Sequence, residues 1–592
     1  MSELQNRRYK EVEPLETVNK LKGLLEKLGI EVEEKWSNES SVGTYSLRLC
    51  IKGTDIGQNG KGMTKEFAMA SGYAEFFERL QNGMFRFRME KPTEELPFVN
   101  APDEKHLSVE ELMKTKNSFL EDILEKNGMK EKPKEEKINY LKNMLKEEYN
   151  YLPYYSMKNK DLEYIPDRLF SYLYDTNGMC AGNSKEEALI EGISEILERY
   201  AGIKIFKEKI TLPEIPMWYI EKFPKVKNMV KKLRQNEQYD FKMIDCSFGG
   251  KYPVAGLYII EKNTGRFGFK MGAHPDYGIA MERCFTEAAQ GRDIYEYAET
   301  CLFDFYDGED SKNRSLTDFI FADFASVPYQ VIGEKVDYEF TEMPDVSNLD
   351  NKTILKNMID NLLKEGRDVL IRDVSILGFQ SFSIAIPGMS EISFDPSAKY
   401  FSIFTTMQEL MKDLKSINKS NLKEVIKMMG VIVNEIGYGK LSILISLKDI
   451  STLPCEQIGN GAKYFLGILY IMNEEYEKAA KLFEDLSFLV DNIVQNPLEK
   501  IMIKAVYYYA SAMDKLKEHS KAMYYIKLLF DHEIANCIDE SFKDRDNILV
   551  NHFGITEDYY VDNDDSFYMA FMKKFREAQR DNPIDQMKIC EL

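Results

Sequence analysis

Residues 62–80 read GMTKEFAMASGYAEFFERL, and residues 182–200 read GNSKEEALIEGISEILERY. The two stretches lie 120 positions apart, and they share glycine, alanine, glutamate and arginine at matching positions. The matched pairs are Gly62 and Gly182, Ala68 and Ala188, Gly72 and Gly192, Glu75 and Glu195, Glu78 and Glu198, and Arg79 and Arg199. In each copy the two glutamates are three residues apart within an apolar helical pattern, so they lie on one helix face. The sequence therefore predicts two related helices that each carry a pair of carboxylates.

The surroundings of these carboxylates indicate a bound cation. Glutamates next to large apolar residues such as Phe76 and Ile196 are costly unless a cation or a proton offsets their charge. A solvated helix face with local Glu–Arg pairs is the simpler explanation for one copy, but two copies in register argue against it. Mg²⁺ prefers oxygen ligands and completes its shell with phosphate and water. We therefore expect a divalent cation and a phosphate ligand.

A third helix, from about residue 280, carries a diverged copy of the pattern. Aligned on Glu287, it keeps an alanine seven residues earlier and has Gln290 in place of the second glutamate. The predicted metal ligands are thus two residues from each helix: Glu75, Glu78, Glu195, Glu198, Glu287 and Gln290.

Basic residues next to these acids are candidates for binding phosphate. Arg79, Arg199 and Arg283 can bind phosphate oxygens bidentately, although ion pairs with the same carboxylates are the structural alternative. Lys61 lies in the sequence Asn-Gly-Lys-Gly, where glycine lets the backbone approach a phosphate, and a plain turn is the alternative. No G-x-x-x-x-G-K-[ST] sequence is present. The predicted phosphate site is therefore not of the Walker type.

Composition narrows the class of protein. A chain of 592 residues predicts two to four domains, and a net charge of −20 argues against a broad nucleic-acid surface. The N-terminus lacks a signal-peptide core, and no apolar run approaches the roughly 20 residues of a membrane span. Eight cysteines occur without a C-x-x-C pair. We expect a cytoplasmic protein with reduced thiols that binds neither membrane nor nucleic acid.

The chain is predicted to divide into a catalytic part and a helical part. Residues 102–150 are dense in lysine and glutamate, which is typical of a solvated, charged helical insertion. Ser184 and Glu187 fit a capping box at the start of the second acidic helix. From residue 456, helical hairpins follow the tetratricopeptide spacing at Leu466, Gly467, Tyr470, Tyr476, Ala479 and Phe483, and again at Ala510, Met513, Ala522 and Ile526.

Four stretches together resemble the YcaO family: residues 59–80, 177–200, 272–292 (GAHPDYGIAMERCFTEAAQGR) and 386–392 (IPGMSEI). The resemblance covers about residues 1–400, and the repeat-containing C-terminus is similar to the long, stand-alone branch. It implies that paired acidic helices hold ATP through Mg²⁺ and that ATP activates a peptide amide. Carried over onto this sequence, it implies nucleotide contacts from Lys10, Thr17, Asn183, Arg199 and Arg283. The predicted nucleotide contacts are these residues together with Lys61 and Arg79 from the patterns above. We predict catalytic roles for Glu78, Glu198 and Gln290.

The resemblance also sets the expected fold and function. We expect an α+β domain of three related helix–strand units with an antiparallel sheet over residues 1–400. A helical connector over 401–455 and an all-α, tetratricopeptide-like domain over 456–592 should follow. The chain should be a homodimer that uses Mg²⁺ and ATP on a peptide or protein substrate.

The stand-alone branch is linked to methylthiolation of a small-subunit ribosomal protein, together with a radical-SAM methylthiotransferase. The C-terminus lacks the Pro-x-Pro-x-Pro tail of the azoline-forming members of the family. A thioamide- or azoline-forming enzyme and a scaffold with a regulatory nucleotide site are the alternatives.

Overall fold

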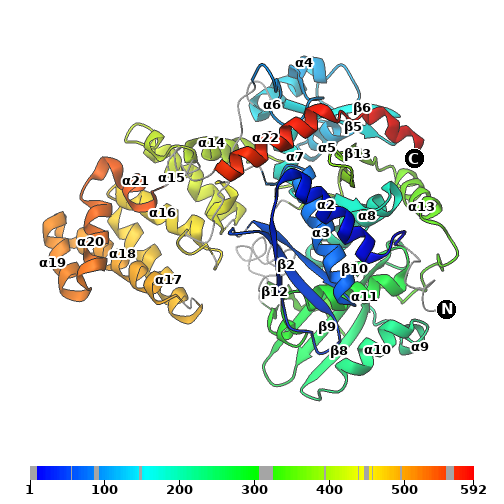
Figure 1. Cartoon of the computed structure of the whole chain (residues 1–592). Helices are drawn as coiled ribbons and strands as arrows, with labels where there is room; N and C mark the ends of the chain where they lie inside the picture. Colours follow the sequence, from blue (N-terminus) through cyan, green and yellow to red (C-terminus); the bar gives the residue numbers. More distant parts are fainter. Residues whose placement is uncertain are drawn as a thin grey trace. The chain divides into compact units, whose positions relative to one another are not determined.

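The computed structural model describes residues 10–54, 56–85, 93–145, 150–305, 325–392, 395–437, 439–445, 453–456, 458–493, 496–554 and 566–592. The chain forms two compact units (Figure 1). Unit 1 contains the residues up to Lys399 together with Tyr568–Leu592, and unit 2 contains Tyr400–Phe567. Unit 1 mixes helices with mainly antiparallel sheets, and the described part of unit 2 is helical, so the predicted α+β and all-α classes are confirmed.

Three strand–helix units organise unit 1, and each acidic helix directly follows a strand (Figure 1). The pairs are β3 (Gly57–Gly62) with α3 (Lys65–Gln81), β7 (Met179–Gly182) with α8 (Lys185–Glu208), and β10 (Arg266–Ala273) with α11 (Tyr277–Ala288). The three strands belong to three different sheets, whereas the sequence analysis expected one.

The first sheet is antiparallel, with β1 (Val32–Trp36), β2 (Tyr45–Ile51) and β3 in that order. The second has the order β4-β5-β13-β14-β7, and β6 pairs with β5; its further strands are β4 (Lys105–His106), β5 (Asn150–Ser156), β6 (Asp161–Pro166), β13 (Leu370–Asp373) and β14 (Gln380–Ala385). The third has the order β12-β11-β10-β9-β8, with β8 (Tyr239–Asp245), β9 (Val254–Glu261), β11 (Cys301–Asp304) and β12 (Ala325–Pro328). Only its β11–β12 pair is parallel among these described strands.

Close glycine contacts fix each acidic helix on its strand. A Cβ on Gly60 would lie 2.5 Å from the backbone nitrogen of Gly72, and a Cβ on Gly192 would lie 2.8 Å from the sulfur of Cys180. The strand positions 60 and 180 are also 120 residues apart, as are the helix positions 72 and 192. The repeat in the sequence is therefore a repeated strand–helix contact, and glycine lets the helix approach closely.

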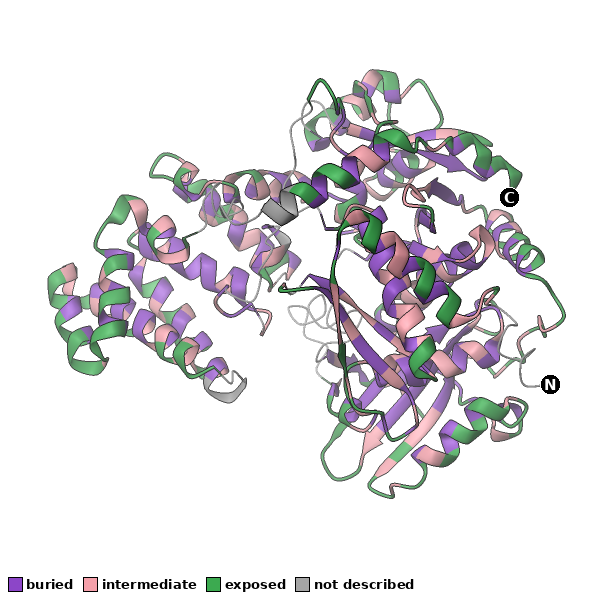
Figure 2. Cartoon of the chain, viewed as in Figure 1, coloured by how far each residue is buried: buried purple, intermediate pink, exposed green. Residues whose placement is uncertain are grey.

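The remaining helices of unit 1 cover these sheets. Helix α2 (Pro14–Leu28) is amphipathic and buries Val18, Leu21 and Leu25 (Figure 2). The others are α4 (Val109–Leu112), α5 (Ser118–Lys126), α6 (Lys134–Leu145), α7 (Asp167–Tyr174), α9 (Met217–Ile220), α10 (Pro224–Leu233) and α13 (Asn351–Lys364).

The predicted insertion at 102–150 is helical but not simply solvated. In α5, Phe119, Leu120 and Ile123 are each at most 1% exposed, because the helix is amphipathic and packs its apolar face inward. The high density of lysine and glutamate in the sequence therefore led us to overlook the apolar face of α5. Part of this stretch, residues 146–149, lies outside the described residues.

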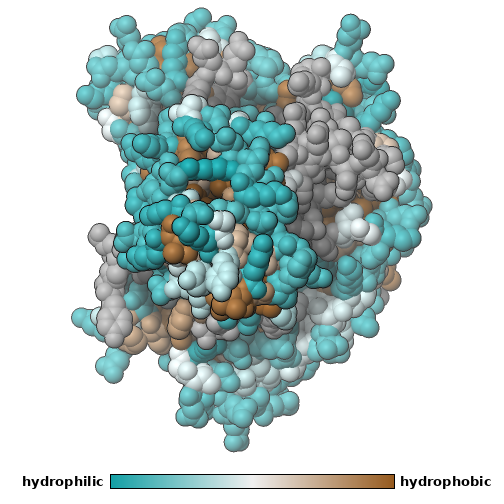
Figure 3. Space-filling view, turned by 90° about the vertical axis from the view of Figure 1, so that its left-hand side faces the viewer, coloured by the Kyte–Doolittle hydropathy of each residue, from teal (hydrophilic) through white to brown (hydrophobic). Residues whose placement is uncertain are grey.

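Unit 2 is a succession of helices: α14 (Phe401–Met411), α15 (Leu422–Gly430), α16 (Gly461–Met472), α17 (Tyr476–Ile493), α18 (Pro497–Leu516), α19 (His519–Leu529), α20 (His532–Phe542) and α21 (Ile548–Phe553). Gly467 of α16 faces Phe483 of α17, whose ring would lie 2.7 Å from an added Cβ. This contact pairs a small residue with a large one where two helices meet. Several apolar side chains of unit 2 are exposed, including Phe488, Leu498 and Leu528. Figure 3 shows hydrophobic residues at the surface among hydrophilic ones on the face that it draws.

The end of the chain corrects the predicted 456–592 domain. Helix α22 (Ser566–Asp581) packs Phe571, Met572 and Phe575 into the core beside α2 and α3, so residues from Tyr568 onward belong to unit 1. Arg576 donates hydrogen bonds to the carbonyl oxygens of Leu96 at 3.3 Å and Phe98 at 2.5 Å. An amphipathic pattern predicts a helix but not the body on which it packs.

Candidate functional site

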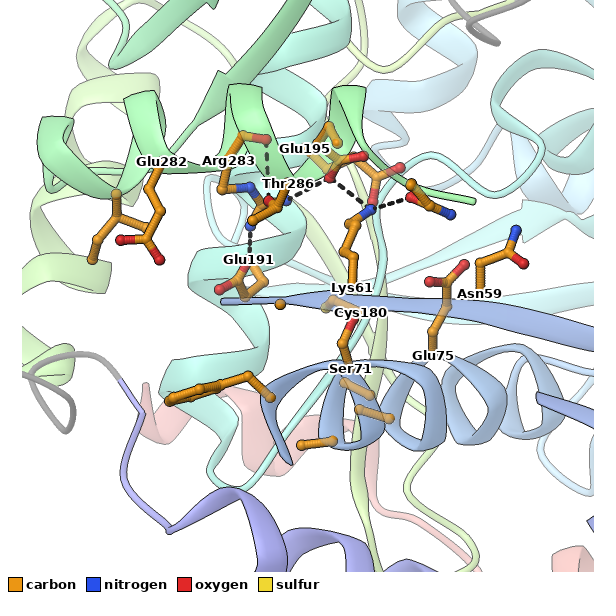
Figure 4. A pocket seen from close by; sticks show the side chains of 18 of the residues that line it. Asn59, Lys61, Ser71, Glu75, Cys180, Glu191, Glu195, Glu282, Arg283 and Thr286 are labelled. Atoms are coloured by element: carbon orange, nitrogen blue, oxygen red, sulfur yellow. Dashed lines mark hydrogen bonds and ion pairs between the residues drawn. The ribbon is translucent and has the colours of Figure 1, made fainter. Parts of the chain in front are cut away.

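One cleft of unit 1, with a volume of about 620 Å³, brings together all the residues predicted for the site. Its lining includes Lys10, Thr17, Lys61, Glu75, Glu78, Arg79, Asn183, Glu195, Glu198, Arg199, Arg283, Glu287 and Gln290. Figure 4 shows that Lys61 extends from its strand, with Glu75 and Glu195 on neighbouring helices. Segments that are more than 200 residues apart in the sequence thus share one surface.

The three acidic helices present equivalent positions to this cleft. Each begins with a capping side chain, Thr64, Ser184 or Asp276, that accepts a hydrogen bond from a backbone N–H of the first turn. The first acid of each pair follows its cap at the same separation in all three helices: Thr64 to Glu75, Ser184 to Glu195, and Asp276 to Glu287. The third helix therefore matches the other two in its cap and its first acid. Gln290 has the sequence offset of Glu78 and Glu198, but it lies just after the end of α11 at Ala288.

Ion pairs link the cations of the cleft to these acids. Arg79 lies 2.5 Å from Glu78 and 3.6 Å from Glu75. Arg199 donates to Glu195 from Nε at 3.0 Å and from Nη2 at 2.8 Å. Lys61 Nζ lies 2.7 Å from Glu287 and donates to Gln290 Oε1 at 2.9 Å. Lys61 therefore connects the first strand–helix unit to the third.

Two further acids of α8 line the cleft, although the sequence analysis did not include them among the site residues. Glu187 pairs with Lys10 at 3.2 Å and accepts a hydrogen bond from the backbone N–H of Glu11 at 3.2 Å. Glu191 pairs with Lys10 at 3.4 Å and with Arg283 (Figure 4). Ser184 does cap the helix, but the Glu187 carboxylate contacts the N-terminal segment, so the reciprocal half of the predicted capping box is not seen.

The N-terminal segment completes one side of the cleft. Thr17 donates a hydrogen bond to the side-chain oxygen of Asn183 at 3.0 Å. Lys10 reaches the carboxylates of α8 from the same segment. His274 lies outside the lining and accepts a hydrogen bond from the N–H of Asp276, so it takes part in the turn before α11.

The acids of the cleft differ in the direction in which their pKa is shifted. Burial raises the pKa of Glu75 and raises that of Glu78 well above its usual value. Burial, followed by the negative charge of Glu287, raises the pKa of Glu198 to about 7. Burial also acts on Glu287, but the positive charges of Lys61, Lys270 and Arg283 outweigh it and lower its pKa to about 2. Glu75, Glu78 and Glu198 are therefore the carboxylates that an added cation would stabilise most.

Glu198 differs from the other acids of the lining because its hydrogen bond is with a backbone N–H and it has no ion pair with a described residue. It accepts a hydrogen bond from the N–H of Ala273 at 3.1 Å, and no ion pair to it is formed within the described residues. A buried carboxylate with a raised pKa and no cationic partner is a favourable ligand for a divalent cation.

The donor set fits Mg²⁺, which prefers carboxylate and amide oxygens. These donors come from three helices and the residues that follow one of them: Glu75 and Glu78 on α3, Glu195 and Glu198 on α8, Glu287 on α11, and Gln290 just after α11. Within the described residues, no group of three or more His, Cys, Asp or Glu side chains is arranged to hold a metal ion by itself. Mg²⁺ commonly takes only one or two carboxylates and completes its shell with substrate phosphates and water.

Comparison with known proteins identifies the family. The YcaO profile, described as YcaO cyclodehydratase that binds ATP and Mg²⁺, matches residues 59–390. The chain therefore belongs to the YcaO family, and its expected ligands are ATP and Mg²⁺. This agrees with the resemblance drawn from the sequence.

Two curated relatives match with 30% identity. One is an uncharacterised protein of Haemophilus influenzae, over 385 residues, which are 64% of this chain and 65% of that protein. The other is the ribosomal protein S12 methylthiotransferase accessory factor YcaO of Escherichia coli, over 381 residues, which are 62% of this chain and 63% of that protein. The matched region thus spans less than two thirds of either relative.

Solved structures give weaker similarities. A heterocyclase in complex with substrate and cofactor has a TM-score of 0.47 and 17% identity, over 65% of this chain and 53% of that one. YcaO from Methanopyrus kandleri, bound with AMPPCP and Mg²⁺, has a TM-score of 0.39 and 16% identity, over 64% of this chain and 92% of that one. In the part of the chain that the structure describes, no helix is long and apolar enough to cross a membrane.

Proposed function

We propose that the cleft of unit 1 binds Mg²⁺-ATP and transfers the γ-phosphoryl group to water or to a peptide amide oxygen. The observation that carries this proposal is the meeting of three equivalent acidic helices with Lys61, Arg79, Arg199 and Arg283 in one cleft. The paired acids and bases suit a ligand that itself combines a divalent cation with a polyanion.

Binding would exchange partners within the cleft. The carboxylates of the three helices would hold Mg²⁺, which neutralises charge on the phosphates when it is bound. Arg79 and Arg199, now held by Glu78 and Glu195, would then turn to phosphate oxygens. Lys61 would do the same from Glu287. These cations would stabilise the charge that develops on the transferred group.

Lys10, Thr17 and Asn183 would contact the nucleotide on the other side of the cleft. Thr17 and Asn183 already share a hydrogen bond of 3.0 Å, and both offer polar atoms to the cavity. The attachment of Lys10 to Glu187 and Glu191 orders the N-terminal segment beside α8. The proposed nucleotide contacts therefore come from both the N-terminal segment and the helices.

The transfer step breaks the bond between the γ-phosphorus and the β,γ-bridging oxygen and forms a bond to the acceptor oxygen. ADP leaves with the electron pair of the broken bond. We assign catalytic roles to Glu78, Glu198 and Gln290. Glu78 and Glu198 would act as ligands of Mg²⁺, which offsets charge on the transferred group when it is bound. The Gln290 amide, already within 2.9 Å of Lys61, would orient the acceptor. When water is the acceptor, its proton passes to the phosphate that forms.

We also propose a substrate and partners for this activity, guided by the names of the relatives. The name of the Escherichia coli relative favours a role in methylthiolation of ribosomal protein S12, beside a radical-SAM methylthiotransferase. The helical hairpins of unit 2 would then hold a protein partner in a tetratricopeptide-like manner, and the chain would act as a cytoplasmic homodimer. A thioamide- or azoline-forming activity is the alternative for the same cleft. None of the described residues of the C-terminal segment 566–592 lines the cleft.

Release of inorganic phosphate from Mg²⁺-ATP tests this function. We expect turnover by the wild type and at least a 100-fold loss in Glu78→Ala and in Glu198→Ala, because each removes a proposed metal ligand. Glu208→Ala is the matched control, since Glu208 ends the same helix as Glu198 but its side chain is 59% exposed and does not line the cleft. Wild-type turnover in both cleft variants would refute the proposal.

A further inference from the structure

Most charged side chains that line the cleft are already paired with one another. The pairs are Lys10 with Glu187 and Glu191, Lys61 with Glu287, Arg79 with Glu75 and Glu78, Arg199 with Glu195, Lys225 with Glu282, and Arg283 with Glu191. Lys270 and Arg292 also line the cleft, yet the side chain of neither makes an ion pair or hydrogen bond with any described residue. Arg292 still has a partner, because its guanidinium lies 5.9 Å from the centre of the Tyr297 ring. Among the described residues, Lys270 is therefore the cation of the lining whose side chain has no ion pair, hydrogen bond or aromatic contact.

The backbone of β10 explains how Lys270 reaches the cleft. Alternate residues of a strand face the same side, so Lys270 shares its face with Gly268 and Gly272. A Cβ on Gly268 would lie 2.4 Å from the carbonyl oxygen of Tyr297, and one on Gly272 would lie 2.5 Å from that of Ala280. The two glycines let α11 and the following segment lie directly on the strand. Lys270 is the long side chain left between them on that face.

Lys270 lines the same cleft as Glu198 of α8 and Glu287 of α11, and its positive charge acts on both acids. Burial is the largest influence on the pKa of both Glu198 and Glu287, and the positive charge of Lys270 opposes it in both. Neither acid forms an ion pair with Lys270, however, and Glu287 is already paired with Lys61 at 2.7 Å. Lys270 therefore offsets part of the charge of both carboxylates while its ammonium stays free of an ion pair with either.

We propose that the Lys270 ammonium binds the terminal phosphoryl group of the nucleotide. This inference rests on the proposed function. Carboxylates of α8 and α11 would hold the metal ion that accompanies the terminal phosphates. A cation that lines the cleft with both sets of carboxylates would then meet the phosphoryl group that is transferred. Lys270 has no internal partner among the described residues to give up, unlike Lys61 and the three arginines.

The test compares two nucleotides that differ in the terminal phosphate. Binding of Mg²⁺ with the β,γ-methylene analogue of ATP, and with ADP, is measured by calorimetry on the full chain. In Lys270→Met, affinity for the analogue should fall on the order of 10- to 100-fold, as expected for one charge-assisted contact, while affinity for ADP stays within about threefold. Lys270→Arg keeps the positive charge, so it should keep most of the difference in affinity between the two nucleotides. A loss seen only in Lys270→Met is then due to the missing charge and not to misfolding.

Lys225→Met is the matched control, because Lys225 lines the same cleft but is already paired with Glu282 at 3.6 Å. It removes the same charge and should leave the analogue-to-ADP affinity ratio within about threefold of wild type. An unchanged ratio in Lys270→Met, with normal binding by the wild type, would overturn this inference alone. No binding of either nucleotide to the wild type would refute the proposed function, and the inference with it.

Discussion

Gly192→Ala tests whether the close contact between α8 and β7 sets the position of the acidic residues. The added methyl carbon would lie 2.8 Å from the sulfur of Cys180 and 2.8 Å from Cδ1 of Ile384. Ordinary contacts are 3.4–4 Å, and the added carbon would also lie 2.9 Å from the Cys180 Cβ, which no side-chain rotation moves. The helix must therefore move away from the strand by several tenths of an ångström. Glu195 and Glu198 follow within the next two turns of the same helix and must move with it.

The expected stability change is small and the expected activity change is large. Overpacking a buried contact costs about 1–3 kcal/mol, and the better helix propensity of alanine returns up to about 1 kcal/mol. The free energy of unfolding should therefore fall by no more than about 2 kcal/mol, a decrease in melting temperature of a few degrees. A misplacement near 1 Å can cost about 100-fold in rate. Phosphate release should thus fall by about that factor while the protein stays folded.

Two matched substitutions give the comparison. In Gly72→Ala the added carbon would lie 3.3 Å from the Gly60 Cα, so we expect a smaller loss of phosphate release than in Gly192→Ala. In Gly23→Ala nothing lies within 4 Å of the added carbon, so the melting temperature should rise slightly with unchanged turnover. Full phosphate release by Gly192→Ala, with a raised melting temperature, would refute the reasoning.

Three further predictions concern other parts of the chain. Lys61→Met removes a charge that lowers the pKa of Glu287 and should raise the KM for Mg²⁺-ATP about tenfold in a phosphate-release assay; an unchanged KM would contradict this role. Burial lowers the pKa of His552 to about 4, so the unfolded state binds more protons between pH 6.5 and 4, and stability is lost as the pH falls through that range. Urea titration of unit 2 signals should show a loss of about 1–2 kcal/mol from pH 7 to pH 5, which His552→Gln should abolish; equal pH dependence in the variant would exclude this group as the cause. Arg576→Ala should lower the free energy of unfolding by about 2–3 kcal/mol, because two buried carbonyl oxygens lose their donor, whereas exposed Arg580→Ala should change it little; equal melting temperatures for both variants would contradict this.

The acidic helices could be predicted because their signals are local. The spacing of Glu75 and Glu78, the capping Thr64 and the apolar residues between them all lie within one helix. The same pattern occurs again 120 residues later. This repeat indicates a functional role for the paired acids, which one helix alone would not indicate. Glu287 could be aligned for the same reason, although Gln290 replaces the second acid of its pair.

The remaining features depend on contacts that are distant in sequence. Three sheets rather than one follow from strand pairing, such as β13 with both β5 and β14, which no local pattern predicts. Glu187 and Glu191 were not assigned to the site, since their roles depend on Lys10, from a different part of the chain. Lys270 lies in an ordinary strand sequence, and only the placement of α11 over its neighbouring glycines marks it.

Diffraction from crystals of the chain grown with Mn²⁺ in place of Mg²⁺ and with the β,γ-methylene analogue of ATP tests the central claim most directly. The anomalous signal of Mn²⁺ locates each metal ion independently of the protein coordinates. We predict metal ions in the cleft at coordination distances of roughly 2 Å from Glu198 and from at least one carboxylate of α3 or α11, with phosphate oxygens completing the shell. Nucleotide and metal bound elsewhere on the chain, or bound in the cleft without a carboxylate from these helices, would contradict it.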